Sequence, residues 1–168
     1  MNVFALTSLI ASVICFFLAN FIYYKNPENK LNRLIAILSI LIAFLAFCEF
    51  GYRQADTLNS AFLYLKLSTL WPFVPSILIN IFLVFTGRNE ILKHRSLTYF
   101  LIYAPAIIIT IIGLATFPEQ TVYEYWGWTY GFDPVPLFFI PMSIWSFIGG
   151  LLTALFILKH YFSTKDRL

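Results

Sequence analysis

The sequence predicts an all-α, polytopic integral membrane helix bundle with five transmembrane helices, the N-terminus outside and the C-terminus in the cytoplasm. The first observation is composition, since 60% of the 168 residues are hydrophobic and 11% are charged. A soluble domain has about 25% charged residues. The second is a set of apolar runs of spanning length, and the third is the gathering of Lys and Arg at alternate connections. The polar residues are too few to build an attached soluble catalytic domain.

Five stretches of the sequence can cross a bilayer. A transmembrane helix needs about 20 mostly apolar residues. The qualifying stretches are residues 3–24, 34–52, 62–86, 97–117 and 137–158. The first of them has no Lys or Arg before it and is too long for the apolar part of a signal peptide, so we expect a permanent helix. The whole chain, residues 1–168, is expected to form a single membrane domain.

The basic residues predict the orientation. Nine Lys and Arg residues follow the first, third and fifth stretches, whereas the other two connections hold Arg53 alone. Cytoplasmic loops are enriched in Lys and Arg, so the side with nine is predicted to be cytoplasmic. These nine are Lys25, Lys30, Arg33, Arg88, Lys93, Arg95, Lys159, Lys165 and Arg167.

Two charged residues lie inside the predicted spans, near their outer ends. They are Glu49 in the second stretch and Lys66 in the third. Arg53 follows Glu49 by four residues and therefore shares its helical face. Charged groups within membrane spans often mark functional sites, which favours an outer ligand-binding cluster. The alternative is structural: Glu49 pairs with Arg53, and Lys66 extends to the interface.

The third stretch carries a polar stripe. Lys66, Thr69, Ser76 and Asn80 fall within about 80° of a helical wheel, and such a face avoids lipid. Lys66 and Thr69 are candidates for a cavity, whereas Ser76 and Asn80 are expected to join helices. Asn20 of the first stretch is a candidate partner for Asn80.

Prolines and small residues modify the predicted helices. Pro72, Pro75, Pro105 and Pro141 each remove a backbone donor and are expected to kink their helices. On the fifth stretch, three small residues spaced by four predict close approach of another helix, within the chain or from a second copy. They are Ser146, Gly150 and Ala154.

The connection between the fourth and fifth stretches, residues 118–136, is rich in aromatic residues. It holds six of them, with three acids and no basic residue. Aromatic side chains favour the membrane interface, so the segment is either an interfacial belt or a lid over an outer cavity. The candidate ligand-contacting aromatics are Trp126, Trp128 and Tyr130 of this segment, together with Trp71 of the third stretch.

Motifs for catalysis or cofactor binding are not found in the sequence. It contains no phosphate-binding loop, no G-x-S-x-G and no metal-binding pattern, and the predicted spans contain no Asp and no His. We therefore expect no catalytic residue, no metal and no cofactor. The short basic connections suit anionic lipid, not nucleic acid, so the bilayer is the expected partner.

Three segments resemble one known family, the N-terminal seven-transmembrane sensor region of bacterial and archaeal histidine kinases. They are residues 29–36 (NKLNRLIA), residues 71–88 from Trp-Pro to Phe-Thr-Gly-Arg, and residues 126–137 with Trp-Gly-Trp-Thr-Tyr and Pro-Val-Pro-Leu. They are similar to the start of the second helix, the third helix and the loop before the fifth helix. The resemblance implies a sensor in a prokaryotic plasma membrane that signals to a cytoplasmic or membrane partner.

The chain departs from that family by lacking the last two helices and the kinase. Either it is a fragment, or it is a reduced protein that works with a partner. The leading interpretation is a sensor or input module without its own kinase domain. The alternatives are a structural or assembly subunit that packs against other membrane helices and, third, a small transporter.

Overall fold

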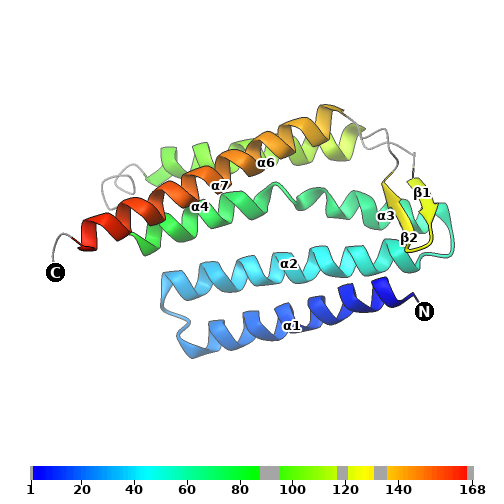
Figure 1. Ribbon diagram of the computed structural model, residues 1–168, viewed down its shortest axis with the longest axis horizontal. Helices are drawn as coiled ribbons and strands as arrows, with labels where there is room; N and C mark the ends of the chain where they lie inside the picture. Colours follow the sequence, from blue (N-terminus) through cyan, green and yellow to red (C-terminus); the bar gives the residue numbers. More distant parts are fainter. Residues whose placement is uncertain (1, 88–94, 117–120, 131–135, 166–168) are drawn as a thin grey trace.

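The chain forms five long helical segments that run back and forth, with a β-hairpin at one end (Figure 1). The structure is a computed structural model, and it describes residues 2–87, 95–116, 121–130 and 136–165. The elements are α1 (Val3–Lys25), α2 (Lys30–Gln54), α3 (Leu58–Leu67), the 3-10 turn η1 (Ser68–Leu70), α4 (Phe73–Phe85), α6 (Arg95–Thr116), β1 (Thr121–Glu124), β2 (Gly127–Tyr130) and α7 (Pro136–Lys165). Within the described residues, five segments are long and apolar enough to cross a membrane, which confirms the five predicted spans.

Two helices begin earlier than the apolar pattern predicts, because polar residues cap them. The Asn29 side chain accepts hydrogen bonds from the backbone of Leu31 and Asn32, so α2 begins at Lys30 and not at residue 34. The Thr57 side chain caps α3 in the same way, and this helix begins at Leu58. Capping satisfies backbone donors that a helix leaves free at its first turn.

The helices differ in how they are surrounded. α1 lies at one side of the bundle and packs chiefly on α2, whereas α4 lies against α2, α6 and α7 (Figure 1). Large apolar side chains point outward from the peripheral helices, for example Phe17, Ile111 and Phe147. Such an exterior suits acyl chains, since a water-soluble protein rarely exposes so large an apolar surface.

The third span is broken near its middle, at residues 68–72. Pro72 and Pro75 lack backbone N–H groups, and the chain passes through η1 before α4 begins at Phe73. Shorter-range bonds replace the missing ones: the Trp71 amide donates to the Ser68 carbonyl at 3.2 Å, and the Val74 amide to the Trp71 carbonyl at 3.0 Å. The kink predicted from these prolines is therefore a short 3-10 break, which we call the break.

Neighbouring helices bond two further carbonyls of the break. Thr110 of α6 donates to the Thr69 carbonyl at 3.2 Å. Trp145 of α7 donates from Nε1 to the Pro72 carbonyl at 3.1 Å. In lipid an unsatisfied carbonyl is costly, so these bonds stabilise the break and tie it to α6 and α7.

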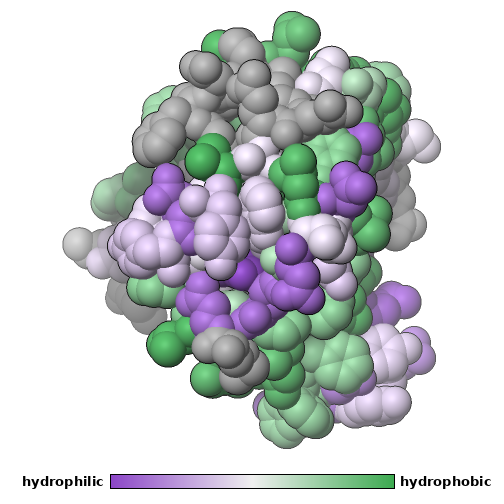
Figure 2. All heavy atoms as spheres, turned by 90° about the vertical axis from the view of Figure 1, so that its right-hand side faces the viewer, coloured by the Kyte–Doolittle hydropathy of each residue, from purple (hydrophilic) through white to green (hydrophobic). Residues whose placement is uncertain are grey.

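The aromatic connection contains a β-hairpin, which the all-α prediction did not include. β1 and β2 pair antiparallel, and Tyr125 and Trp126 form the two-residue turn. Gly127 has φ +100°, and a Cβ atom there would lie 2.3 Å from the Arg53 carbonyl oxygen. Only glycine fits this close approach, and the hairpin therefore packs directly on the end of α2. We call this the hairpin end of the bundle; hydrophilic residues gather in the middle of its surface (Figure 2).

Candidate functional site

A cavity of about 200 Å³ lies beside the break, toward the hairpin end. Its walls come from α2, the break and β2. The α2 residues far from the hairpin are apolar, whereas those near it include a carboxylate and a phenol. The cavity is lined by Ile42, Leu45, Ala46, Glu49, Tyr52, Ser68, Trp71 and Tyr130. A mostly apolar pocket with a few convergent polar groups is the usual form of a small-molecule site.

Glu49 is the charged residue of this cavity, and Arg53 engages one of its two oxygens. Arg53 Nε and Nη2 both donate to Glu49 Oε1, at 3.0 and 2.5 Å. Oε2 accepts no hydrogen bond from the described residues, and the Glu49 side chain is 37% exposed. The ion pair therefore holds the carboxylate in place through Oε1 alone.

Tyr130 connects the hairpin to the break. Its hydroxyl hydrogen-bonds the Ser68 hydroxyl. Since Ser68 donates to the Leu65 carbonyl at 2.6 Å, Tyr130 is the donor to Ser68. Burial raises the pKa of Tyr130 to about 12, so the phenol keeps its proton at neutral pH. Its ring packs edge-on against Tyr52 and Phe139, with centroids 6.1 and 5.5 Å away.

The eight predicted ligand residues do not form one cluster. Glu49, Trp71 and Tyr130 line the cavity described above. Lys66 lies outside it, with Nζ 4.8 Å from the centre of the Phe62 ring, and in the described residues it forms no ion pair with Glu49. Thr69 is buried, and its hydroxyl donates to the Lys66 carbonyl at 2.7 Å.

Arg53 and Trp128 line a second, more polar pocket at the same end of the bundle. It has a volume of about 530 Å³ and lies between the start of α1, the end of α2 and the hairpin. Trp128 Nε1 donates to the Ala55 carbonyl at 2.8 Å, which fixes the indole beside α2. The Gln54 Nε2 atom is buried there and has no hydrogen-bond partner in the described residues. Trp126 lines neither pocket and packs edge-on against Tyr125.

Five of the eight lining residues were not predicted from the sequence, and two of these five, Tyr52 and Ser68, are polar. Tyr52 follows Glu49 by three residues and therefore shares its helical face, so the spacing was a usable signal. Ser68 precedes Pro72 by four residues, and Pro72 cannot donate to the Ser68 carbonyl. That signal marks the end of a regular helix, but it does not indicate that Tyr130 approaches from the hairpin.

The predicted packing residues of the third span do join helices, but Asn80 does so with a partner other than the candidate Asn20. Ser76 donates to the Ile102 carbonyl of α6 at 2.8 Å. Asn80 Nδ2 donates to the Tyr103 hydroxyl at 3.0 Å. The predicted partner Asn20 instead bonds the Phe16 carbonyl of its own helix. The expected Asn20–Asn80 bond is wrong because α1 packs on α2, on the far side from α6.

The predicted small-residue face of α7 points away from the bundle. Ser146 and Ala154 are exposed, and a Cβ atom at Gly150 would meet nothing within 4 Å. The close approach instead occurs at Gly149, where a Cβ atom would lie 2.5 Å from Pro75 Cβ. Whether another chain covers the outward face stays a prediction.

The described residues contain no group of three or more His, Cys, Asp or Glu side chains that could hold a metal ion. The features of this end of the molecule are a small cavity, a broken helix and an aromatic hairpin. A family model described as the N-terminal 7TM region of histidine kinase matches residues 7–167.

The chain belongs to this family. The match confirms the resemblance that three motifs of the sequence indicated. It covers both the break and the hairpin. The family name counts seven spans, and the described residues of this 7TM region contain five helical segments of spanning length. Comparison with curated proteins and with solved structures gave no match.

Proposed function

We propose that this 7TM-family chain is the input module of a signal-transduction system in a prokaryotic plasma membrane, and that it acts on a separate or attached signalling partner. The observation that carries the proposal is that two residues belong both to the cavity and to the break. Ser68 and Trp71 line the cavity and also belong to the break. The break is bonded to α6 and α7. A ligand in the cavity therefore touches the element that joins three helices.

The hairpin end is proposed to face outward. In the sequence the nine basic residues lie at or near the α1–α2 and α4–α6 junctions and toward the end of α7, whereas the hairpin belongs to the α6–α7 connection. The positive-inside rule places the side with these basic residues in the cytoplasm. The cavity then receives ligand from outside or from the outer leaflet, and α7 carries the change inward.

The lining indicates the class of ligand. One oxygen of Glu49 is free to accept a hydrogen bond, and Ile42, Leu45 and Ala46 offer an apolar wall. A cavity of about 200 Å³ is below the range of about 300–1,000 Å³ typical of drug-sized ligands. The best fit is a small amphiphile with a cationic or hydrogen-bond-donating head.

The mechanism is a shift between two packings of the broken helix. A ligand changes the equilibrium only if it binds one packing more tightly. Trp71 and Ser68 move with the break, and so does the Pro72 carbonyl that Trp145 of α7 bonds. Contact between the ligand and Trp71 or Ser68 therefore favours one position of α7 over another.

A thermal-shift assay tests the ligand site. The purified chain in detergent is heated with n-hexylammonium or n-hexanoate as probes. At ten times its dissociation constant, the ammonium probe should raise the melting temperature by about 3 °C, and hexanoate should not. Glu49→Gln should lose the response, whereas Lys66→Ala, outside the cavity, should keep it. An equal shift in wild type and Glu49→Gln contradicts the proposed site.

A distance measurement separates a sensor from an assembly subunit. Spin labels at Tyr125 in the hairpin turn and Leu158 near the far end of α7 report on the bundle's length; both residues are exposed. A sensor should change this distance when n-hexylammonium binds, and Glu49→Gln should abolish the change.

The outward Ser146, Gly150 and Ala154 favour the assembly role as the second candidate. An unchanged distance with intermolecular crosslinking of Gly150→Cys supports that role.

A further inference from the structure

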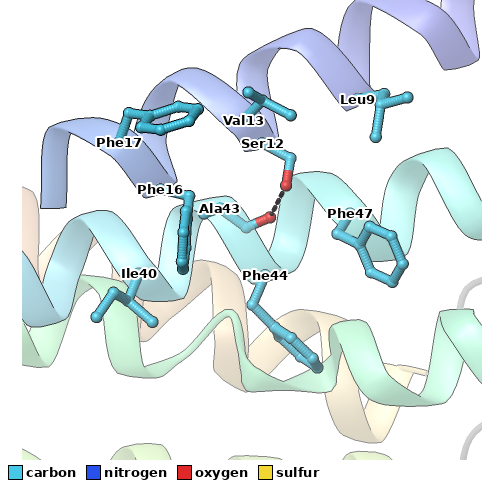
Figure 3. Close-up of a pocket in the computed structure, with 9 residues that line it drawn as sticks. All are labelled: Leu9, Ser12, Val13, Phe16, Phe17, Ile40, Ala43, Phe44 and Phe47. Atoms are coloured by element: carbon cyan, nitrogen blue, oxygen red, sulfur yellow. Dashed lines mark hydrogen bonds between the residues drawn. The ribbon is translucent and has the colours of Figure 1, made fainter. Parts of the chain in front are cut away.

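A long apolar groove runs between α1 and α2, away from the cavity and the hairpin. Its larger part, whose lining residues are drawn in Figure 3, has a volume of about 500 Å³. The only hydrogen bond across its floor joins the Ser12 hydroxyl to the Ala43 carbonyl at 2.7 Å, in the described residues (Figure 3). That bond occupies the hydroxyl's donor, so the groove presents apolar carbon to an occupant. It is lined by Leu9, Ser12, Val13, Phe16, Phe17, Ile40, Ala43, Phe44 and Phe47.

The groove continues toward the end of the bundle opposite the hairpin. A second hollow of about 330 Å³ lies between the same two helices, and Ile40 lines both. This hollow ends at Arg33 and at the phenols of Tyr23 and Tyr24. Arg33 is exposed and forms no ion pair in the described residues. The groove is therefore apolar over most of its length and basic at one end.

Its length matches an acyl chain. Arg33 and Phe47 are 14 residues apart on α2, which is about 21 Å at 1.5 Å per residue. One leaflet of a bilayer has a hydrocarbon depth of about 15 Å, half of roughly 30 Å. A lipid whose head lies at Arg33 can therefore lay a whole chain in the groove.

We propose that the α1–α2 groove binds one anionic phospholipid, with the phosphate at Arg33 and an acyl chain along Ile40 toward Phe47. Charge complementarity selects the head, because a guanidinium binds phosphate bidentately. Tyr23 and Tyr24 lie at headgroup depth, where aromatic residues with a polar tip are favoured. This site is separate from the ligand cavity and does not depend on the sensor proposal.

Native mass spectrometry of the full chain tests the site, with phosphatidylglycerol and phosphatidylcholine as matched probes. The wild type should retain one phosphatidylglycerol in preference to phosphatidylcholine. Arg33→Ala should weaken retention about fivefold, the effect of one basic residue near an anionic surface, and Arg33→Lys should weaken it less. Lys159→Ala removes an exposed cation on the same side of the membrane but outside the groove, and it should leave retention unchanged.

A second pair of variants tests the acyl part. Ile40 is 50% exposed and Ile108 of α6 is 56% exposed, so tryptophan can replace either without entering the core. Ile40→Trp should fill the groove and reduce lipid retention, whereas Ile108→Trp should not. Three results overturn the proposal. The first is equal retention of the two lipids, and the second is equal loss of lipid in Arg33→Ala and Lys159→Ala, or in Ile40→Trp and Ile108→Trp. The third is a protein dimer that Ile40→Trp abolishes. The last result assigns the groove to a second copy.

Discussion

The third and fifth spans are equally apolar but have different surroundings. Each has a mean hydropathy of 1.8 over its best window. In that window 56% of the third span's residues are buried, against 6% for the fifth. Hydropathy identifies both as membrane helices and cannot distinguish the one in the centre of the bundle from the one at its edge. Polar groups make that distinction.

The centre of the bundle concentrates the polar bonds between helices. The break and α4 bond α6 through the Thr69 carbonyl, Ser76 and Asn80, and bond α7 through the Pro72 carbonyl. α7 meets this centre at Trp145 and Gly149 and turns most of its other face outward. How deeply a residue is buried in the bundle therefore depends more on whether it contacts the broken helix than on the hydropathy of its span. Three matched pairs of substitutions test this comparison.

The largest expected effect comes from two adjacent glycines of α7. Gly149→Val should destabilise the fold by about 2 kcal/mol, because its Cβ atom overlaps Pro75 and overpacking costs roughly 1–3 kcal/mol. Gly150→Val makes the same change in open space and should be near neutral. Unfolding in mixed micelles with increasing dodecyl sulfate, followed by circular dichroism, measures both. Equal losses would show that α7 does not pack as described.

A smaller effect is expected from two tryptophans. Trp145→Phe removes the donor to the Pro72 carbonyl and should cost about 1 kcal/mol, the usual worth of such a bond. Trp71 is 50% exposed, and its indole donates no hydrogen bond to the described residues. Trp71→Phe should therefore change stability by less than about 0.5 kcal/mol. The same unfolding assay compares them, and a larger loss in Trp71→Phe would contradict the proposed centre.

The sequence predicts the spans well because crossing a bilayer imposes a length of about 20 apolar residues on each. It predicts the break in part, since Pro72 and Pro75 must interrupt backbone bonding. It also selects three of the eight cavity residues, Glu49, Trp71 and Tyr130. Glu49 stands out as a charge within a predicted span, Tyr130 as part of the aromatic connection, and Trp71 as a tryptophan next to Pro72.

The remaining features depend on how helices lie side by side, which local pattern does not determine. Ser146, Gly150 and Ala154 have the expected spacing, yet Gly149 makes the contact, because one residue turns the helix by about 100°. Pairing Asn80 with Asn20 required α1 to reach α4, but α2 lies beside α1. Ser68 hydrogen-bonds Tyr130, which belongs to a hairpin that begins more than fifty residues later. Such long-range choices are set by packing.

The smallest effect concerns the two asparagines, and a double-mutant cycle isolates it. Asn80 loses one good bond to Tyr103 when changed to Leu, but its Oδ1 atom is buried without a partner in the described residues. Asn80→Leu alone therefore combines a loss with a gain, and its net effect is not informative. The cycle of Asn80→Leu with Tyr103→Phe should give a coupling of about 0.6 kcal/mol, the average for hydrogen bonds between membrane helices.

The control cycle replaces Asn80→Leu by Asn20→Leu. Asn20 bonds the Phe16 carbonyl of its own helix, so its coupling to Tyr103→Phe should be zero within error. Both cycles use the same chemistry and the same second substitution, and they differ only in whether the asparagine lies in the centre of the bundle. A coupling of zero in both cycles would mean that Ser76 and the break, and not Asn80, hold α6 against α4.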